Sequence, residues 1–282
     1  MLPPRLKLLL KRSPIRPLLQ RRRFHAYCLG APKTGTTSIS MMLRRHYRAE
    51  HEPLGAGTLE LVQAALRDGA AQDDIEARLR RRDRELYLEM ESSHPMTVLA
   101  GPLAAAFPAA RFVLVYREPR AWLDSIINMR LERAVHRFDR TPRPDNIFWL
   151  VNEYFYRSRY PVHPPEERLL ETLGLYTLDG YLSGWARHHA LVLDNVPPDR
   201  LLVVEVSDLT RHPERLARFL GVAPESLDRS AGHANRATGN HAVLDQLDPA
   251  LIEARIEQHC GALSATLQRL RQEWAGRLDR DG

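Results

Sequence analysis

The chain has 282 residues and a net charge of +6, with 44% hydrophobic and 27% charged residues, a composition typical of a globular protein with a sizeable core. Its apolar runs fall well short of the roughly 20 residues that a transmembrane helix needs, and its 2 cysteines, Cys28 and Cys260, form no CxxC pair. A membrane-spanning chain, a disulfide scaffold and a cysteine zinc site are therefore excluded.

Most of the positive charge lies at the N-terminal end. Residues 1–25 hold 8 lysines and arginines and no acidic residue, so the remainder has a net charge of −2. Prolines argue against one long amphipathic helix there, and the three leucines at 8–10 make too short a run for a signal peptide. Two interpretations stay open: a solvated leader, and a segment that contacts anionic lipid or nucleic acid without sequence specificity. We predict a basic tail over 1–23 and a cytoplasmic protein, with peripheral membrane contact through 1–25 as one option.

Strand-like and helix-like segments alternate from residue 24 onward, which predicts βαβ units around a parallel sheet in one domain over 24–282. In chain order, strands are predicted at 24–29, 47–52, 85–90, 111–116 and 201–206. Helices are predicted after residue 38, as a polar pair within 58–82, after Pro95, from Pro119, at 213–220, and as C-terminal helices within 249–278. The run 111–116 is apolar, as expected of a strand buried on both faces.

The stretch 138–185 differs from the rest of the chain. It holds 10 of the 20 aromatic residues and 5 prolines, so it reads as an inserted loop-and-helix region rather than a sheet unit. Aromatic side chains can form an apolar wall for a ligand. We expect most of them to be the core of an added helical layer.

The turn at 30–38 has the features of an anion site. A strand, a glycine-containing turn and a helix N-terminus direct backbone N–H groups and the helix dipole at a ligand. Four residues separate Gly30 from Gly35, the spacing of a P-loop, but Thr36 stands where a Walker motif requires lysine. The lysine is Lys33 instead, and it is the only lysine after residue 25 in a chain with 38 arginines among its 41 basic residues. The alternative is an ordinary Gly-Thr turn.

A second feature follows the strand 111–116. Magnesium nucleotide enzymes commonly end such a strand in aspartate, whereas this one is followed by Arg117, with Ser125 eight residues later. An arginine and a hydroxyl suit a second phosphate rather than a metal ion. The alternative is an arginine neutralised by its neighbours Glu118 or Asp124.

Together these motifs resemble the sulfotransferases that use 3′-phosphoadenosine 5′-phosphosulfate (PAPS). Residues 32–38 (PKTGTTS) resemble the family's 5′-phosphosulfate loop, and 117–125 (REPRAWLDS) resemble its 3′-phosphate motif. The resemblance covers roughly 24–130 and 180–222, and it implies a P-loop-NTPase-like three-layer α/β sandwich with a central parallel sheet. It assigns donor binding to Lys33, Thr34, Gly35, Thr36, Thr37, Ser38, Arg117 and Ser125.

The resemblance also implies a mechanism. Lys33 would lie against the bridging and leaving oxygens of PAPS, no metal would be needed, and adenosine 3′,5′-bisphosphate would be released. The acceptor hydroxyl, or amine, needs a base, and two residues match base positions of different family members: His94, after the strand at 85–90, and Glu52, after the strand at 47–52. Glu89 and Glu91 are weaker options for orienting the acceptor, which would be a small molecule, a lipid or a carbohydrate.

Two other functions stay open at this point. One is a P-loop kinase that uses Mg-ATP, with a displaced lysine and with Glu89 or Glu91 as metal ligand. The other is a non-catalytic nucleotide-binding module targeted by its basic tail. The sequence does not indicate an oligomeric state.

Overall fold

A parallel sheet of five strands lies at the centre of the molecule. The computed structural model describes residues 21–53, 55–66, 69–132, 146–157, 160–233 and 241–280, so most of the predicted tail lies outside the described residues. The strands pair in the order β2-β3-β1-β4-β5, and every pair is parallel. Their bounds are β1 Ala26–Leu29, β2 Ala49–His51, β3 Met90–Ser92, β4 Arg111–Tyr116 and β5 Leu201–Glu205.

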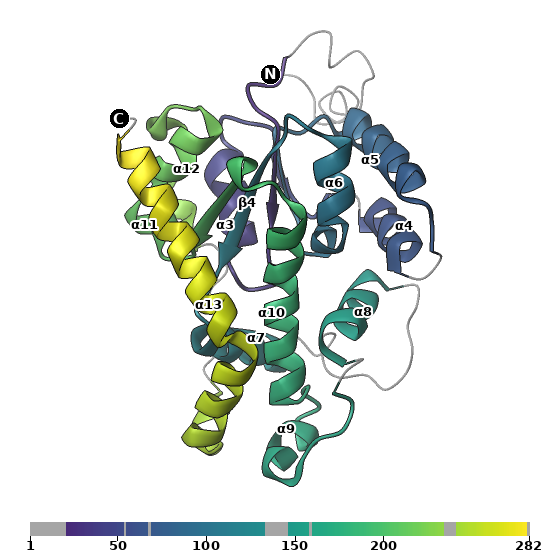
Figure 1. Cartoon of the computed structure of the whole chain (residues 1–282), viewed down its shortest axis with the longest axis vertical. Coiled ribbons are helices and arrows are strands. Elements are labelled where there is room, and N and C mark those ends of the chain that lie inside the picture. The colour runs from purple at the N-terminus through teal and green to yellow at the C-terminus, as the bar shows by residue number, and fades with distance from the viewer. Residues whose placement is uncertain are drawn as a thin grey trace.

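Helices cover both faces of this sheet (Figure 1). The described helices include α3 Thr36–Leu43, α4 Gly55–Leu66, α5 Gln72–Leu86, η1 Pro95–Leu99, α6 Ala100–Ala106, α7 Pro119–Glu132, α8 Ile147–Asn152, η3 Glu153–Arg157, α9 Arg168–Thr172, α10 Leu178–Asn195, α11 Asp208–Arg211, α12 Pro213–Leu220 and α13 Pro249–Arg280. The long α13 runs beside α10 and also packs on β5, α7 and α12.

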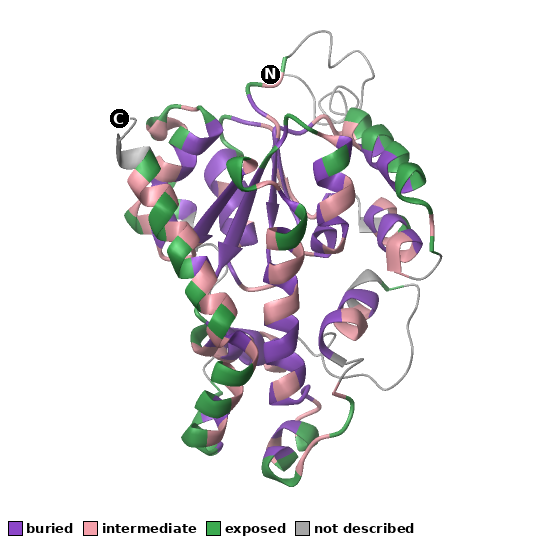
Figure 2. Cartoon of the chain, viewed as in Figure 1, coloured by how far each residue is buried: buried purple, intermediate pink, exposed green. Residues whose placement is uncertain are grey.

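Alternation along the strands sorts the core into two layers. In β1, Ala26 and Cys28 pack with α3 and α12, whereas Tyr27 and Leu29 pack with α4, η1, α6 and α10. Figure 2 shows most residues of these strands buried, between helices whose outer faces are largely exposed. A strand that is apolar on both sides requires cover on both sides. The predicted P-loop-like three-layer α/β sandwich with a central parallel sheet is therefore confirmed.

One predicted strand was wrong in position. Residues 85–90 were expected to form it, but α5 continues to Leu86 and the strand is Met90–Ser92. The helix ends where Tyr87 turns left-handed (φ 48°) and its N–H closes the last turn on Asp83. The alternating apolar residues of 86–90 mimic a strand, although the first of them belong to the helix and its cap. The C-terminal helices expected within 249–278 are one helix, α13.

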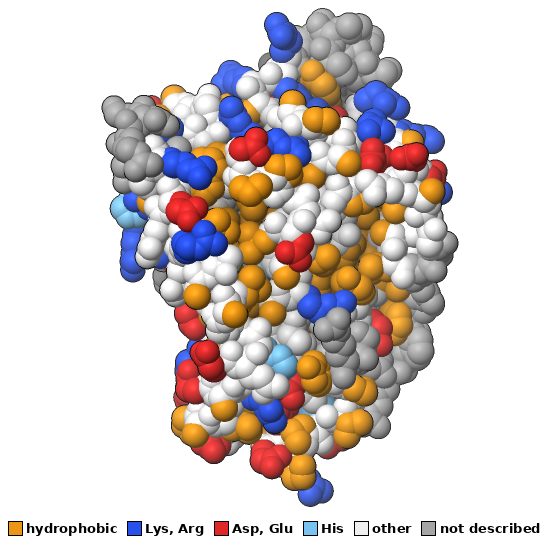
Figure 3. Space-filling model, in the orientation of Figure 1, with side chains coloured by type: hydrophobic (Ala, Val, Ile, Leu, Met, Phe, Trp, Pro, Cys, Tyr) orange, Lys and Arg blue, Asp and Glu red, His pale blue; other side chains and the backbone are white. Residues whose placement is uncertain are grey.

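The described part of 138–185 consists of α8, η3, α9 and the first half of α10. Several of its aromatic side chains, such as Tyr156, Tyr181 and Trp185, are fully buried, as in an added core layer. None of the described helices has the length and apolar character needed to cross a bilayer. On the face shown in Figure 3, basic and acidic side chains intermingle.

Candidate active site

The loop after β1 is folded tightly against the end of β4. A Cβ atom added to Gly30 would lie 2.6 Å from the Val115 carbonyl oxygen, so no larger residue fits there. Gly35 (φ 112°) caps α3, and Lys33 adopts a left-handed backbone (φ 67°) that is costly for any residue but glycine. No side chain caps this helix. The N–H groups of its first turn, which begins at Thr36, are therefore placed to meet an anion.

Neighbouring elements hold the loop in this shape. Thr34, fully buried, donates its hydroxyl to the Ala31 carbonyl at 2.7 Å, and Trp122 of α7 donates its indole N–H to the Pro32 carbonyl at 2.7 Å. On the other side, the Ser92 hydroxyl at the end of β3 donates to the Thr36 carbonyl at 2.6 Å. The loop geometry is thus set by β3 and α7 before any ligand arrives.

Arg117 and Ser125 are the residues predicted to hold a second anion, and α7, which carries Ser125, contacts the loop through Trp122. Arg117 follows β4, and its carbonyl accepts the indole N–H of Trp185 at 3.1 Å; Ser125 is a buried residue of α7. The carboxylate of Glu118 accepts two N–H groups of the first turn of α7, at 3.1 and 3.0 Å, while Asp124 accepts the amide of Asn128 at 3.1 Å. Each of these carboxylates therefore has a partner in α7.

The two alternative bases form one pair. Glu52 follows β2 and His94 follows the adjacent β3, and His94 Nδ1 lies 2.5 Å from Glu52 Oε1. Because Nδ1 faces a carboxylate, it is the protonated ring nitrogen, and Nε2 is the nitrogen that can accept a proton. Glu52 has a left-handed backbone (φ 49°), a second strained position in this region. The sequence offers Glu52 and His94 as alternative bases, whereas in the structure they are hydrogen-bonded to each other.

A third residue, His51, was missed by the sequence analysis. Its Nε2 lies 3.0 Å from the Thr37 hydroxyl, its Nδ1 lies 2.9 Å from the Ser92 carbonyl oxygen, and its Nε2 is 3.7 Å from Glu52 Oε1. His51 pairs with Ser92 in the sheet, and Ser92 pairs with Cys28 of β1. The carboxyl ends of three neighbouring strands thus bring these groups together. Its only sequence signal was its place directly before Glu52.

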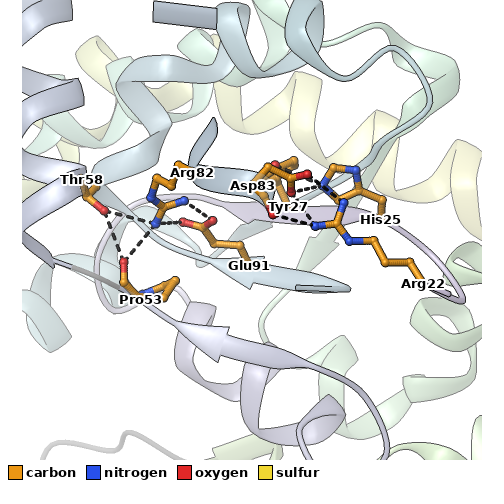
Figure 4. A network of polar contacts seen from close by, with 8 residues as sticks. All are labelled: Arg22, His25, Tyr27, Pro53, Thr58, Arg82, Asp83 and Glu91. Carbon is orange, nitrogen blue, oxygen red and sulfur yellow. Dashed lines mark hydrogen bonds and ion pairs between the residues drawn. The ribbon is translucent and has the colours of Figure 1, made fainter. Parts of the chain in front are cut away.

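Glu89 and Glu91, considered above for metal or acceptor roles, each have structural partners. Glu89 accepts the backbone N–H groups of Arg23 and Arg48, each at 2.9 Å. Glu91 forms a buried bidentate pair with Arg82, at 2.5 and 2.8 Å, and Arg82 also donates to the Pro53 carbonyl at 3.0 Å (Figure 4). This pair ties β3 to the segment that follows Glu52.

No trio of His, Cys, Asp or Glu side chains that could hold a metal ion occurs within the described ranges. The prediction of a metal-free reaction nevertheless stays a prediction, because the structure does not test it.

Comparison with known proteins gives a family. A family profile described as "Sulfotransferase domain" matches residues 27–235, more than half of the chain. Two similar solved structures are the sulfotransferase domain from the Synechococcus PCC 7002 olefin synthase (17% identity, 89% of this chain and 94% of that chain covered, TM-score 0.37) and one from the curacin biosynthetic pathway (13%, 86% and 97%, TM-score 0.36). At these scores neither likeness carries an argument about activity. No curated protein matches the chain.

Proposed function

The chain belongs to the sulfotransferase domain family, and we propose that it moves a sulfuryl group from PAPS to an acceptor hydroxyl or amine. The observation that carries the proposal is the arrangement at one sheet edge: an uncapped phosphate-type loop containing Lys33 beside a hydrogen-bonded Glu52–His94 pair. Ligands of open α/β sheets bind at the carboxyl ends of the strands, where both features lie.

The residues present suit an anionic donor with two phosphate positions. The close approach at Gly30 and the free first turn of α3 make a cradle for one group, and Arg117 with Ser125 would hold the other. When bound, PAPS supplies the sulfuryl group and a bisphosphate that leaves with the bridging electron pair. Lys33 would offset the charge that develops on the leaving oxygen, as a compact ammonium can.

The Glu52–His94 pair would supply the base. His94 Nε2 would take the proton of the acceptor hydroxyl as its oxygen forms a bond to sulfur and the bond from sulfur to the bridging oxygen breaks. Glu52, 2.5 Å from Nδ1, would keep the ring in the correct tautomer and stabilise the imidazolium that forms. In this assignment His94 is the catalytic base and Glu52 is its positioning residue.

The acceptor, the cytoplasmic location and the role of the basic tail remain part of the proposal. A small molecule, a lipid or a carbohydrate would serve as acceptor, and membrane contact through residues 1–25 would be peripheral. A kinase is the weaker reading, because the carboxylates considered as its metal ligands are engaged by arginine side chains or N–H groups.

Ligand preference tests the proposal. Adenosine 3′,5′-bisphosphate should raise the melting temperature of the full chain, whereas Mg-ATP should have little effect. Lys33→Ala should abolish sulfuryl transfer and keep the circular dichroism spectrum, with the loop variant Thr34→Ser as a matched control that retains the hydroxyl bond to Ala31. Stabilisation by Mg-ATP alone would refute the assignment of PAPS as donor.

A further inference from the structure

His51 joins the donor loop to the base pair through one short chain of contacts. On one side its Nε2 lies 3.0 Å from the Thr37 hydroxyl, in the first turn of α3; on the other it lies 3.7 Å from Glu52 Oε1. Glu52 in turn holds His94. His51 therefore touches both halves of the proposed site.

The tautomer of His51 follows from its second contact. Nδ1 lies 2.9 Å from the Ser92 carbonyl oxygen, which also accepts the backbone N–H of Glu52 at 3.0 Å. A carbonyl oxygen can only accept, so Nδ1 carries a proton. In the neutral ring Nε2 then has a lone pair, and the Thr37 hydroxyl must donate its proton to it.

A hydrogen bond donated by the Thr37 hydroxyl to His51 Nε2 is unfavourable for an anion bound at the loop. A hydroxyl has one proton, so when Thr37 gives it to His51, the hydroxyl oxygen can offer only lone pairs to a phosphate bound at the first turn of α3. When Nε2 is protonated the bond reverses: Nε2–H donates to Thr37 Oγ1, and the hydroxyl proton can turn to the anion. The charge on His51 thus decides whether Thr37 acts as donor or acceptor toward the ligand.

We propose that His51 is a positioning residue whose proton directs the Thr37 hydroxyl toward the donor nucleotide, so that donor binding takes up a proton. The inference rests on the proposed function, since it assumes that an anion occupies the loop. Linkage makes the effect reciprocal: the ligand favours the protonated ring, and the protonated ring favours the ligand.

Solvent reaches the His51 ring. His51 is partly exposed and lines a cleft of about 810 Å³. Glu52 Oε1 is an anionic neighbour of His51 Nε2 at 3.7 Å, and a bound phosphate would be a second one. The cleft is also lined by the charged or titratable groups Glu50, Asp228, Arg44, Arg45, Arg48 and Tyr47, and His94 contacts Glu52.

Calorimetric titration of the full chain with adenosine 3′,5′-bisphosphate at pH 7.5, in two buffers of different ionisation enthalpy, counts the protons taken up on binding. The wild type should take up close to one proton more than His51→Gln, because the glutamine amide can donate to Thr37 without titrating. The affinity of the wild type for the bisphosphate should also fall by up to tenfold per pH unit above pH 7.5, whereas the affinity of His51→Gln should not. His46→Gln is the matched control, because His46 is an exposed histidine just beyond α3.

Thr37→Val should remove the extra proton uptake although His51 is still present. This variant tests the inference if His51→Gln does not fold. Equal uptake by the wild type and both variants would overturn the inference and leave the proposed function intact. Failure of the wild type to bind the bisphosphate at all would instead overturn the proposed function.

Discussion

Replacing Glu52 by glutamine separates the two roles within the Glu52–His94 pair. Glutamine keeps an oxygen that can accept the Nδ1–H of His94, so the ring orientation and tautomer are preserved. Only the negative charge is lost. If His94 is the base, Glu52→Gln should therefore weaken catalysis without abolishing it, whereas His94→Ala should remove the proton acceptor itself.

The geometry sets the size of the effect. The bond from Nδ1 to Oε1 is 2.5 Å long and its side chains are 12% and 24% exposed, so it is charge-assisted but partly screened by solvent. Hydrogen bonds to charged groups contribute about 1.5–3 kcal/mol and neutral ones about 0.5–1.5 kcal/mol. The difference of roughly 1–2 kcal/mol corresponds to a loss of about 5- to 30-fold in kcat. Loss of a general base costs about 10²–10⁴-fold.

The assay is release of adenosine 3′,5′-bisphosphate from PAPS with a panel of phenol, sugar and aliphatic alcohol acceptors, followed by kcat at saturation with the best one. The double variant Glu52→Gln/His94→Ala should be no slower than His94→Ala within about threefold, because Glu52 acts through His94. A loss of 10³-fold for Glu52→Gln beside a mild loss for His94→Ala would refute this reasoning and make Glu52 the base.

Two further predictions concern stability. Arg82→Met should lower the free energy of unfolding by about 3–5 kcal/mol in urea denaturation, because it leaves the Glu91 carboxylate buried without its partner; adding Glu91→Leu should recover much of the loss, and a loss under about 1 kcal/mol would contradict this. Burial lowers the pKa of His189 to about 4, so the native ring stays neutral while the unfolded chain takes up a proton below about pH 6.5. Stability should therefore fall by about 3 kcal/mol between pH 6.5 and pH 4, and His189→Phe should remove that part of the decline; an unchanged pH profile in the variant would show the ring to be protonated in the native state.

The fold was largely predictable because its signals are local. The buried strand 111–116, the loop from Gly30 and the proline that opens α7 each depend on a few consecutive residues, and all are found where they were predicted. The prediction of a strand at 85–90 was wrong for the same reason. Its alternating apolar residues suit either a strand or the end of a helix, and only the packing of α5 decides between them.

The chemical inventory of the site was also present in the sequence: a lysine in a glycine loop, an arginine after a buried strand, and a glutamate and a histidine after two others. The sequence did not show which of these residues contact one another. Glu52 and His94 are 42 residues apart and touch because parallel strands joined by crossover connections end side by side. The same register lays His51 against Thr37. Residue type and local pattern determined which groups this protein carries, whereas the order and register of its strands decided which of them meet.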